Sequence, residues 1–201
     1  LEEHLRALGD LLGPFPYSEL EIVERGNGVA GFAEAPGVIA VSRFDSPPSQ
    51  VVTTRAGGDT LLGALARQWL VADLGAATSH DEWLIEGLVA LARCGALQAA
   101  DQGGRCQGDL AGARRSWLDL LDGGALGGDT RARDLLAGAV WAADASGAAW
   151  ANRTLRGPLI VHMIRLLVGD DAMWATLRAV RDAYGGQTLS LASFLVQIQG
   201  R

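Results

Sequence analysis

The feature of the sequence that most constrains the fold is a change in hydrophobic periodicity near residue 59. Before this point, Leu20–Glu24 alternates apolar and acidic residues, which predicts a half-buried strand, and Val38–Val41 predicts a second strand. After it, apolar residues recur at helical spacing in one segment after another. Early strands followed by a run of helices predict an α+β domain, with a small β-sheet in residues 1–58 and a mostly helical region in residues 59–201.

Glycine and proline mark where the expected elements end. Gly26–Gly31 is a predicted turn, Ser46–Ser49 is a predicted loop, and Gly103–Gly108 is predicted to be a mobile loop. The expected helices are Leu1–Leu12, Thr60–Val71, Asp81–Leu97, Leu110–Leu121, Arg131–Ala145, Thr154–Val168, Asp171–Tyr184 and Leu191–Gln199. At 201 residues the chain is long enough to bury a sizeable core as one domain.

The charge and hydropathy of the chain argue against two classes of partner. With a net charge of -6, the chain lacks the basic balance that is typical of nucleic-acid-binding proteins. Its apolar run Leu159–Val168 is interrupted by His162 and Arg165 and is far shorter than the roughly 20 residues that cross a bilayer. We therefore expect no nucleic-acid partner and no membrane span in this segment. The sequence leaves the cellular compartment open.

The chain contains two cysteines, Cys94 and Cys106. They could form one disulfide, but they do not make the framework of a disulfide-rich domain, and there is no CxxC metal knuckle. We expect two free thiols, with Cys94 buried on a helix. Because the chain begins at Leu1 rather than at methionine, we also expect it to be a piece of a longer protein.

Several short segments carry a resemblance to a known family. They are Gly13–Tyr17 followed by Leu20–Glu24, Gly31–Gly37, Gln68-Trp69, Trp83–Gly87, Arg156-Gly157 and Val161–Ile164. In this order they resemble the entry strand, the GxMENPG segment, the residues after the zinc helix and the helix after the catalytic tyrosine of the gluzincin zinc aminopeptidases, the family of membrane alanyl aminopeptidase and leukotriene hydrolase. The resemblance covers nearly all of residues 1–201 and implies a thermolysin-like (gluzincin) peptidase domain.

The resemblance also locates the positions at which that family binds zinc. Its motif is H-E-x-x-H, eighteen residues and then E, and counting back from Glu86 puts the first three motif residues at Gly63, Ala64 and Arg67. Glycine and alanine carry no ligand atom and no base, whereas arginine stays protonated and repels a divalent cation. The catalytic tyrosine of the family aligns with Thr154, whose side chain is too short to reach the same point. The resemblance therefore implies a degenerate site with no zinc and no other cofactor.

The three histidines of the chain do not suggest a replacement metal site. None has a second histidine four residues away, which is the spacing that lets two imidazoles on one helical face share a zinc ion. His4 lies on the first predicted helix, and His162 lies in an apolar helix where we expect a core residue. His80 is expected to be a cap or loop residue before the helix that contains Glu86.

Loss of the metal would leave Glu86 as a potentially buried carboxylate, which is costly without a partner. Arg67 occupies a former ligand position, and its guanidinium fork suits a carboxylate. We expect an ion pair between Arg67 and Glu86 where the metal would lie; the alternative is that Arg67 extends into solvent and Glu86 accepts from a backbone amide. Glu34 matches the family residue that recognises a peptide amino terminus, so Glu34 and Glu86 are candidate peptide-binding residues. Alternatively, Glu34 is a solvated loop residue.

Three functions fit these residues. The first is a non-catalytic structural or protein-interaction module that contacts other domains of a longer chain or a protein partner. The second is a pseudopeptidase that binds peptide amino termini through Glu34 and Glu86. The third is an active zinc-dependent aminopeptidase whose ligands the motif comparison does not identify.

Overall fold

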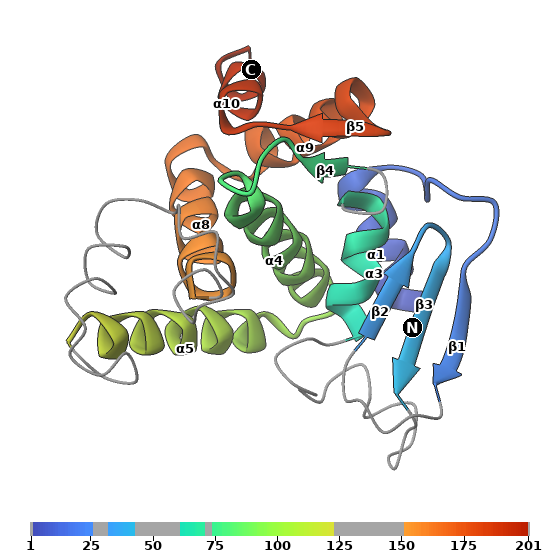
Figure 1. Cartoon of the computed structure of the whole chain (residues 1–201), viewed down its shortest axis with the longest axis horizontal. Helices are drawn as coiled ribbons and strands as arrows, with labels where there is room; N and C mark the ends of the chain where they lie inside the picture. Colours follow the sequence, from blue (N-terminus) through green and yellow to red (C-terminus); the bar gives the residue numbers. More distant parts are fainter. Residues whose placement is uncertain (1, 26–31, 43–60, 71–73, 123–150, 201) are drawn as a thin grey trace.

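The computed structural model describes residues 2–25, 32–42, 61–70, 74–122 and 151–200, and Figure 1 shows how these parts are arranged. The domain is α+β, as the change in periodicity predicts. The elements within the described ranges are α1 (Glu2–Leu12), β1 (Glu21–Arg25), β2 (Phe32–Ala35), β3 (Val38–Ser42), α3 (Leu61–Leu70), β4 (Leu74–Ala76), α4 (Glu82–Ala99), α5 (Gly103–Leu121), the π-helical turn η1 (Asn152–Arg156), α8 (Gly157–Val168), α9 (Asp170–Tyr184), β5 (Gln187–Leu189) and α10 (Leu191–Gln199).

A three-stranded sheet lies at one edge of the domain, with the strand order β1-β3-β2 (Figure 1). β1 pairs with β3 in parallel, and β2 and β3 form an antiparallel hairpin. Gly37 closes the hairpin with a φ of 72°, a conformation that favours glycine. The N–H of Gly37 donates to Oε1 of Gln68 at 3.0 Å, and Gln68 is fully buried on α3. This buried bond holds α3 against the hairpin.

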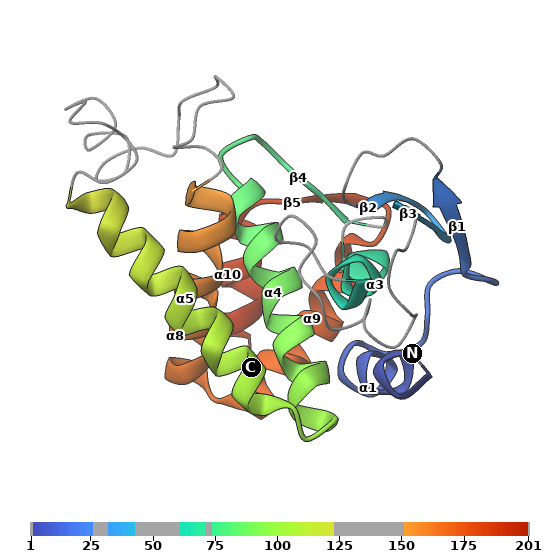
Figure 2. The same cartoon turned by 90° about the horizontal axis from the view of Figure 1, so that it is seen from below.

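The long helix α4 runs through the centre of the helical region and packs against α8, α1, α3 and α5. Its contact with α8 is close because Gly87 faces the start of that helix. A Cβ on Gly87 would lie 2.5 Å from Cγ2 of Val161 and 2.7 Å from the carbonyl oxygen of Gly157, so a side chain does not fit there. Figure 2 shows α5 along α4 and α8, on the side away from the sheet.

The structure corrects the prediction that Gly103–Gly108 is a mobile loop, because these residues form the first turns of α5. It also divides the predicted helix Thr154–Val168 into η1 and α8. The strands β2, β4 and β5 were not predicted; β4 pairs with β5 across more than a hundred residues, which no local pattern reveals. The predictions for Gly26–Gly31, Ser46–Ser49 and Arg131–Ala145 lie outside the described residues.

The prediction of two free thiols is wrong, because Cys94 on α4 and Cys106 on α5 form a disulfide. A tight turn reverses the chain between the two helices: Asp101 adopts a φ of 55°, and the N–H of Gln102 donates to the carbonyl oxygen of Leu97 at 2.7 Å. This reversal brings the two cysteine Cα atoms to 5.0 Å, within the range of a disulfide. Cys94 is buried on a helix, as expected.

No helix in the described part of the chain is both long enough and apolar enough to cross a membrane.

Candidate functional site

The positions that the resemblance assigns to zinc binding lie where α3 packs against α4. Gly63 and Ala64 are buried on α3, and Arg67 lies one helical turn further along the same helix. Glu86 is half-buried on the facing helix α4. The sequence spacing therefore places Arg67 and Glu86 on two helices that touch.

Two neighbours of Arg67 in the sequence fix the position of α3. Gln68 bonds the hairpin turn, as described above, and Trp69 is 1% exposed. The indole Nε1 of Trp69 donates to the carbonyl oxygen of Gly13 at 2.9 Å, and the Trp69 ring packs edge-on against Phe15. Gln68 and Trp69 thus hold α3 against the β2–β3 hairpin and against Gly13 and Phe15.

Arg67 and Glu86 form the expected ion pair. Nη1 of Arg67 donates to Oε1 of Glu86 and Nη2 donates to Oε2, each at 2.6 Å. The side chains are 15% and 24% exposed, so the pair is only partly screened by solvent. Such a two-pronged, charge-assisted contact is among the stronger side-chain hydrogen bonds.

The chemistry of these residues does not fit a zinc ion. Both carboxylate oxygens of Glu86 accept from the guanidinium of Arg67, and a fixed positive charge lies where a cation would have to bind. Gly63 and Ala64 supply no ligand atom. Within the described ranges, no three His, Cys, Asp or Glu side chains are grouped so that they could hold a metal ion.

The resemblance assigns the family's catalytic tyrosine to Thr154, which lies on η1. Thr154 is exposed there. The neighbouring residue Arg153 donates from Nη1 to Oε2 of Glu82 at 2.7 Å, and Glu82 lies one helical turn before Glu86 on α4. Both side chains of this second pair are more than 40% exposed, so we assign it little stabilisation. It does show that η1 docks on the same helix that carries Glu86.

Glu34 lies on β2, opposite Ile39 of β3 in the hairpin register. It is therefore on a strand and not in a loop, and β2 packs against α3. The direction of the Glu34 side chain lies outside what the structure describes. A role for Glu34 in peptide binding stays a prediction.

The histidines lie in three different settings. His4 is buried on α1, and neither ring nitrogen has a hydrogen-bond partner among the described residues; burial lowers the pKa of His4 below its ordinary value. His162 is half-buried on α8 and not in the core as expected, and burial, followed by the charge of Arg165, lowers its pKa. His80 lies in the turn before α4, where its N–H donates to Oγ1 of Thr78 at 3.2 Å.

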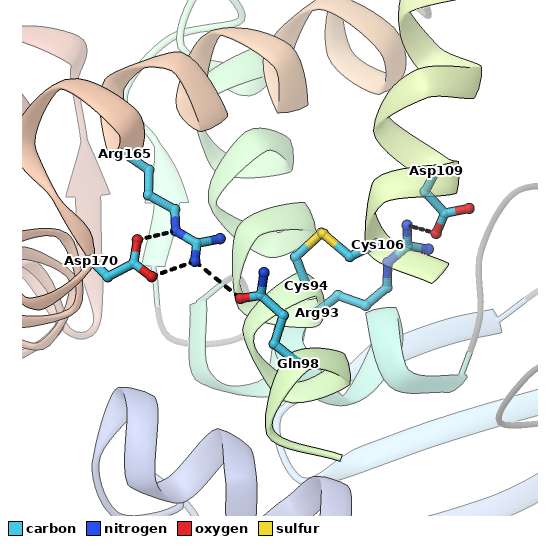
Figure 3. The surroundings of a disulfide bond; sticks show 7 residues. All are labelled: Arg93, Cys94, Gln98, Cys106, Asp109, Arg165 and Asp170. Carbon is cyan, nitrogen blue, oxygen red and sulfur yellow. Dashed lines mark hydrogen bonds and ion pairs between the residues drawn. A yellow bond between two sulfur atoms is a disulfide. The ribbon is translucent and has the colours of Figure 1, made fainter. Parts of the chain in front are cut away.

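The sequence reasoning missed a polar cluster that surrounds one buried arginine. Arg165 is 6% exposed on α8; its Nε and Nη2 donate to the carboxylate of Asp170 at 2.7 and 2.6 Å, and Nη2 also donates to Oε1 of Gln98 at 3.0 Å (Figure 3). The hydrogen bond from Arg165 lowers the pKa of Asp170. An arginine inside an apolar run was the only available signal. Because these contacts join α4, α8 and α9, the cluster ties helices together.

No protein-family model and no curated protein matches the chain. Its structure is similar to that of the M1 zinc metallopeptidase from Deinococcus radiodurans, with 22% identity, a TM-score of 0.65 and coverage of 98% of this chain and 39% of the other. A mutant of that peptidase bound to a Tyr-Ser-Ala substrate gives 24% identity, a TM-score of 0.64 and the same coverage.

Yeast LTA4 hydrolase in complex with bestatin is similar too, with 14% identity and a TM-score of 0.69; the match covers 99% of this chain and 31% of the hydrolase. The chain thus spans about two fifths or less of these solved structures. At these identities the matches show a shared fold. The described chain therefore has the fold of a part of an M1 zinc metallopeptidase.

Proposed function

We propose that this chain is a degenerate member of the gluzincin aminopeptidase family, with a thermolysin-like domain that acts as a non-catalytic structural or protein-interaction module. The observation that carries the proposal is the ion pair between Arg67 and Glu86, because it joins the two helices at the positions where the family holds zinc. The fold shared with M1 zinc metallopeptidases supports the alignment on which those positions depend.

The ion pair offers a physical replacement for one role of the metal. A zinc ion held by two helices also ties them together, and its loss would leave Glu86 without a counter-charge. The guanidinium of Arg67 supplies both the positive charge and two directed hydrogen bonds from the facing helix. The contact between α3 and α4 is thereby kept without the ligand set that metal chemistry requires.

The proposed partner is either another domain of a longer chain or a separate protein. The chain spans 39% of the Deinococcus radiodurans peptidase, so a protein of that size would contain further domains beside this one. A folded domain in which the Arg67–Glu86 ion pair occupies the zinc position is suited to hold such domains in place. This role for the domain rests on the coverage and on the inferred loss of catalysis.

The same ion pair argues against binding of peptide amino termini at Glu86. A carboxylate that already accepts two hydrogen bonds from arginine has lost most of its attraction for an ammonium group. We expect a peptide with a free amino terminus and its acetylated form to bind equally weakly in calorimetric titrations. Stronger binding of the free form, lost in Glu34→Gln and Glu86→Gln variants, would instead support the pseudopeptidase.

The assignment of the degenerate site can be tested by restoring the motif. The triple variant Gly63→His, Ala64→Glu and Arg67→His is expected to bind one zinc ion per chain, because it recreates two imidazoles one helical turn apart facing Glu86. The matched control carries Ala64→Gln in place of Ala64→Glu, which keeps the size of the side chain and both imidazoles. Both variants are checked for folding by circular dichroism and for zinc by elemental analysis after dialysis.

We expect equal zinc uptake in the two folded variants and none in the parent chain. Turnover of aminoacyl arylamides, if it is recovered, is expected in the Glu variant alone, since a base is needed beside the metal. Failure of both folded variants to take up zinc would contradict the register assigned to Gly63, Ala64 and Arg67.

A further inference from the structure

The helix α5 is attached to the domain in an unusual way. Among its residues Gly103–Leu121, Cys106 is the buried one, with 1% of its surface exposed. The disulfide joins it to Cys94, which is 5% exposed on α4 (Figure 3). A surface helix is ordinarily held by an apolar stripe along one face. Near the start of α5, a covalent bond takes that place.

The sequence of α5 makes it a weak helix by itself. Four of its residues are glycine, and glycine in a helix interior costs backbone entropy. Gly104, Gly108 and Gly112 follow each other at intervals of four, so they lie on one face, and a Cβ added at any of them would meet nothing within 4 Å. Tertiary contacts, rather than intrinsic propensity, must hold this half of α5 in helical form.

The two ends of α5 are held by different contacts. At the first half, Nη2 of Arg93 donates to Oδ2 of Asp109 at 2.6 Å beside the disulfide (Figure 3). The second half packs on η1, where Trp117 contacts a small cluster that includes Leu155, and the guanidinium of Arg156 lies 5.7 Å from the centre of the Trp117 ring. The disulfide, the ion pair between Arg93 and Asp109, and the packing of Leu110 on the main core therefore hold the first half, and the apolar cluster with Trp117 holds the second.

We propose that the Cys94–Cys106 disulfide is a redox-sensitive clamp, whose reduction releases the first half of α5 from α4 while the rest of the domain stays folded. The reductant is a dithiol. One of its thiolates attacks a cysteine sulfur and breaks the protein disulfide, and its second thiol resolves the mixed disulfide. The dithiol leaves as a disulfide, and its two electrons and two protons end on the thiols of Cys94 and Cys106.

Burial of both cysteine residues sets the conditions under which the clamp opens. A dithiol reaches them only when the start of α5 separates briefly from α4, so reduction is coupled to this local opening. Once the disulfide is broken, the start of α5 can return to α4 only by ordering a glycine-rich helix, and no covalent bond offsets the loss of backbone entropy. Released α5 would uncover the face of α4 on which it lies and offer a new surface to a partner.

Hydrogen exchange measured by mass spectrometry tests the clamp directly. The chain is compared before and after treatment with dithiothreitol, with peptides from 103–112 as the reporter and peptides from α9 as the internal control. We expect the reporter amides to exchange at least tenfold faster after reduction, while the α9 amides change by less than twofold. A Cys94→Ser/Cys106→Ser variant is expected to show the faster exchange with or without dithiothreitol.

Three results would overturn the proposal. The first is unchanged protection of the reporter after a mass increase has verified reduction. The second is equal loss of protection in the reporter and in α9, which would mean that the bond stabilises the whole domain. The third is the finding of two alkylatable thiols in the denatured, unreduced chain. Because wild-type protein supplies each of these results, the test stands even if the double variant does not fold.

Discussion

Replacing Arg67 by methionine is the sharpest perturbation of the candidate site, because it removes the charge and keeps most of the side-chain volume. Glu86 would then lose both of its short hydrogen bonds while remaining three-quarters covered. Loss of one partner costs about 3–5 kcal/mol for a fully buried pair and about 0–1 kcal/mol for an exposed one. Exposures of 15% and 24% place this pair between the two limits, so we expect Arg67→Met to lower the free energy of unfolding by about 2 kcal/mol.

Urea unfolding followed by circular dichroism measures this loss. With a denaturant slope of about 2 kcal/mol per molar urea, the midpoint would fall by about 1 M. Arg6→Met is the matched control, since Arg6 also forms an ion pair, with Glu2, but the two side chains are 70% and 88% exposed. We expect its midpoint to stay within the error of the wild-type value.

A double variant separates the pair from other contacts of Arg67. In Arg67→Met/Glu86→Leu both charges are gone, and we expect the midpoint to return most of the way to the wild-type value, because an apolar pair needs no counter-charge. The interaction energy from the cycle of single and double variants then isolates the contact. Additive effects, or an Arg67→Met midpoint equal to that of the Arg6→Met control, would refute the proposed replacement of the metal by an ion pair.

Other parts of the fold yield three further predictions. Gly87→Ala is expected to destabilise the domain by about 1–3 kcal/mol in urea unfolding, because its Cβ would overlap Val161. His4→Phe is expected to flatten the pH dependence of stability below the ordinary histidine pKa of 6.5: the folded pKa is lowered, so the wild type loses stability as the pH falls through this region. Asp170→Asn is expected to destabilise at neutral pH and to match the wild type at pH values below the lowered pKa of Asp170, since protonation removes the charge that Arg165 binds.

Each of these predictions has its own control and contrary outcome. Gly112→Ala lies in open space on α5, so it is expected to be neutral or stabilising; equal losses at Gly87 and Gly112 would contradict the packing argument. For His4→Phe, an unchanged slope of stability between pH 5 and 7 would show that His4 is protonated without cost. For Asp170→Asn, a constant difference from the wild type down to pH 2 would mean that charge is not the cause.

Local patterns predicted most of the helices but few of the strands. The periods of Thr60–Val71, Asp81–Leu97 and Asp171–Tyr184 place α3, α4 and α9 within a few residues, because each of these helices has an apolar face directed to the core. The strands β4 and β5 contain three residues each and pair across more than a hundred residues, so no short window of sequence contains both strands. The prediction for the start of α5 is wrong because the local signal was misleading. The glycines of Gly103–Gly108 predict a loop, but the disulfide and tertiary contacts override this local preference.

The ion pair between Arg67 and Glu86 could be predicted from the charges of the two side chains and from the positions that the resemblance assigns to them. When Glu86 is aligned with the zinc-binding glutamate of the family, Arg67 takes the position of the second histidine ligand. An arginine at that position is the natural partner for the charge of Glu86. The disulfide was missed because the tight turn at Asp101 is what brings Cys94 and Cys106 together, and the backbone conformation of a single aspartate cannot be read from its neighbours. Peptide binding through Glu34 remains a prediction for a related reason, since a strand position alone does not determine what a side chain binds.

The metal content of the purified chain, measured by elemental analysis after removal of chelators, tests the central claim most directly. A site in which Arg67 neutralises Glu86 predicts less than a tenth of a zinc ion per chain at equilibrium with micromolar zinc, a level that rises only in the folded variants with the restored motif. One tightly held zinc ion per wild-type chain would contradict the account, because it would require ligands other than the residues assigned here and would favour an active zinc-dependent aminopeptidase.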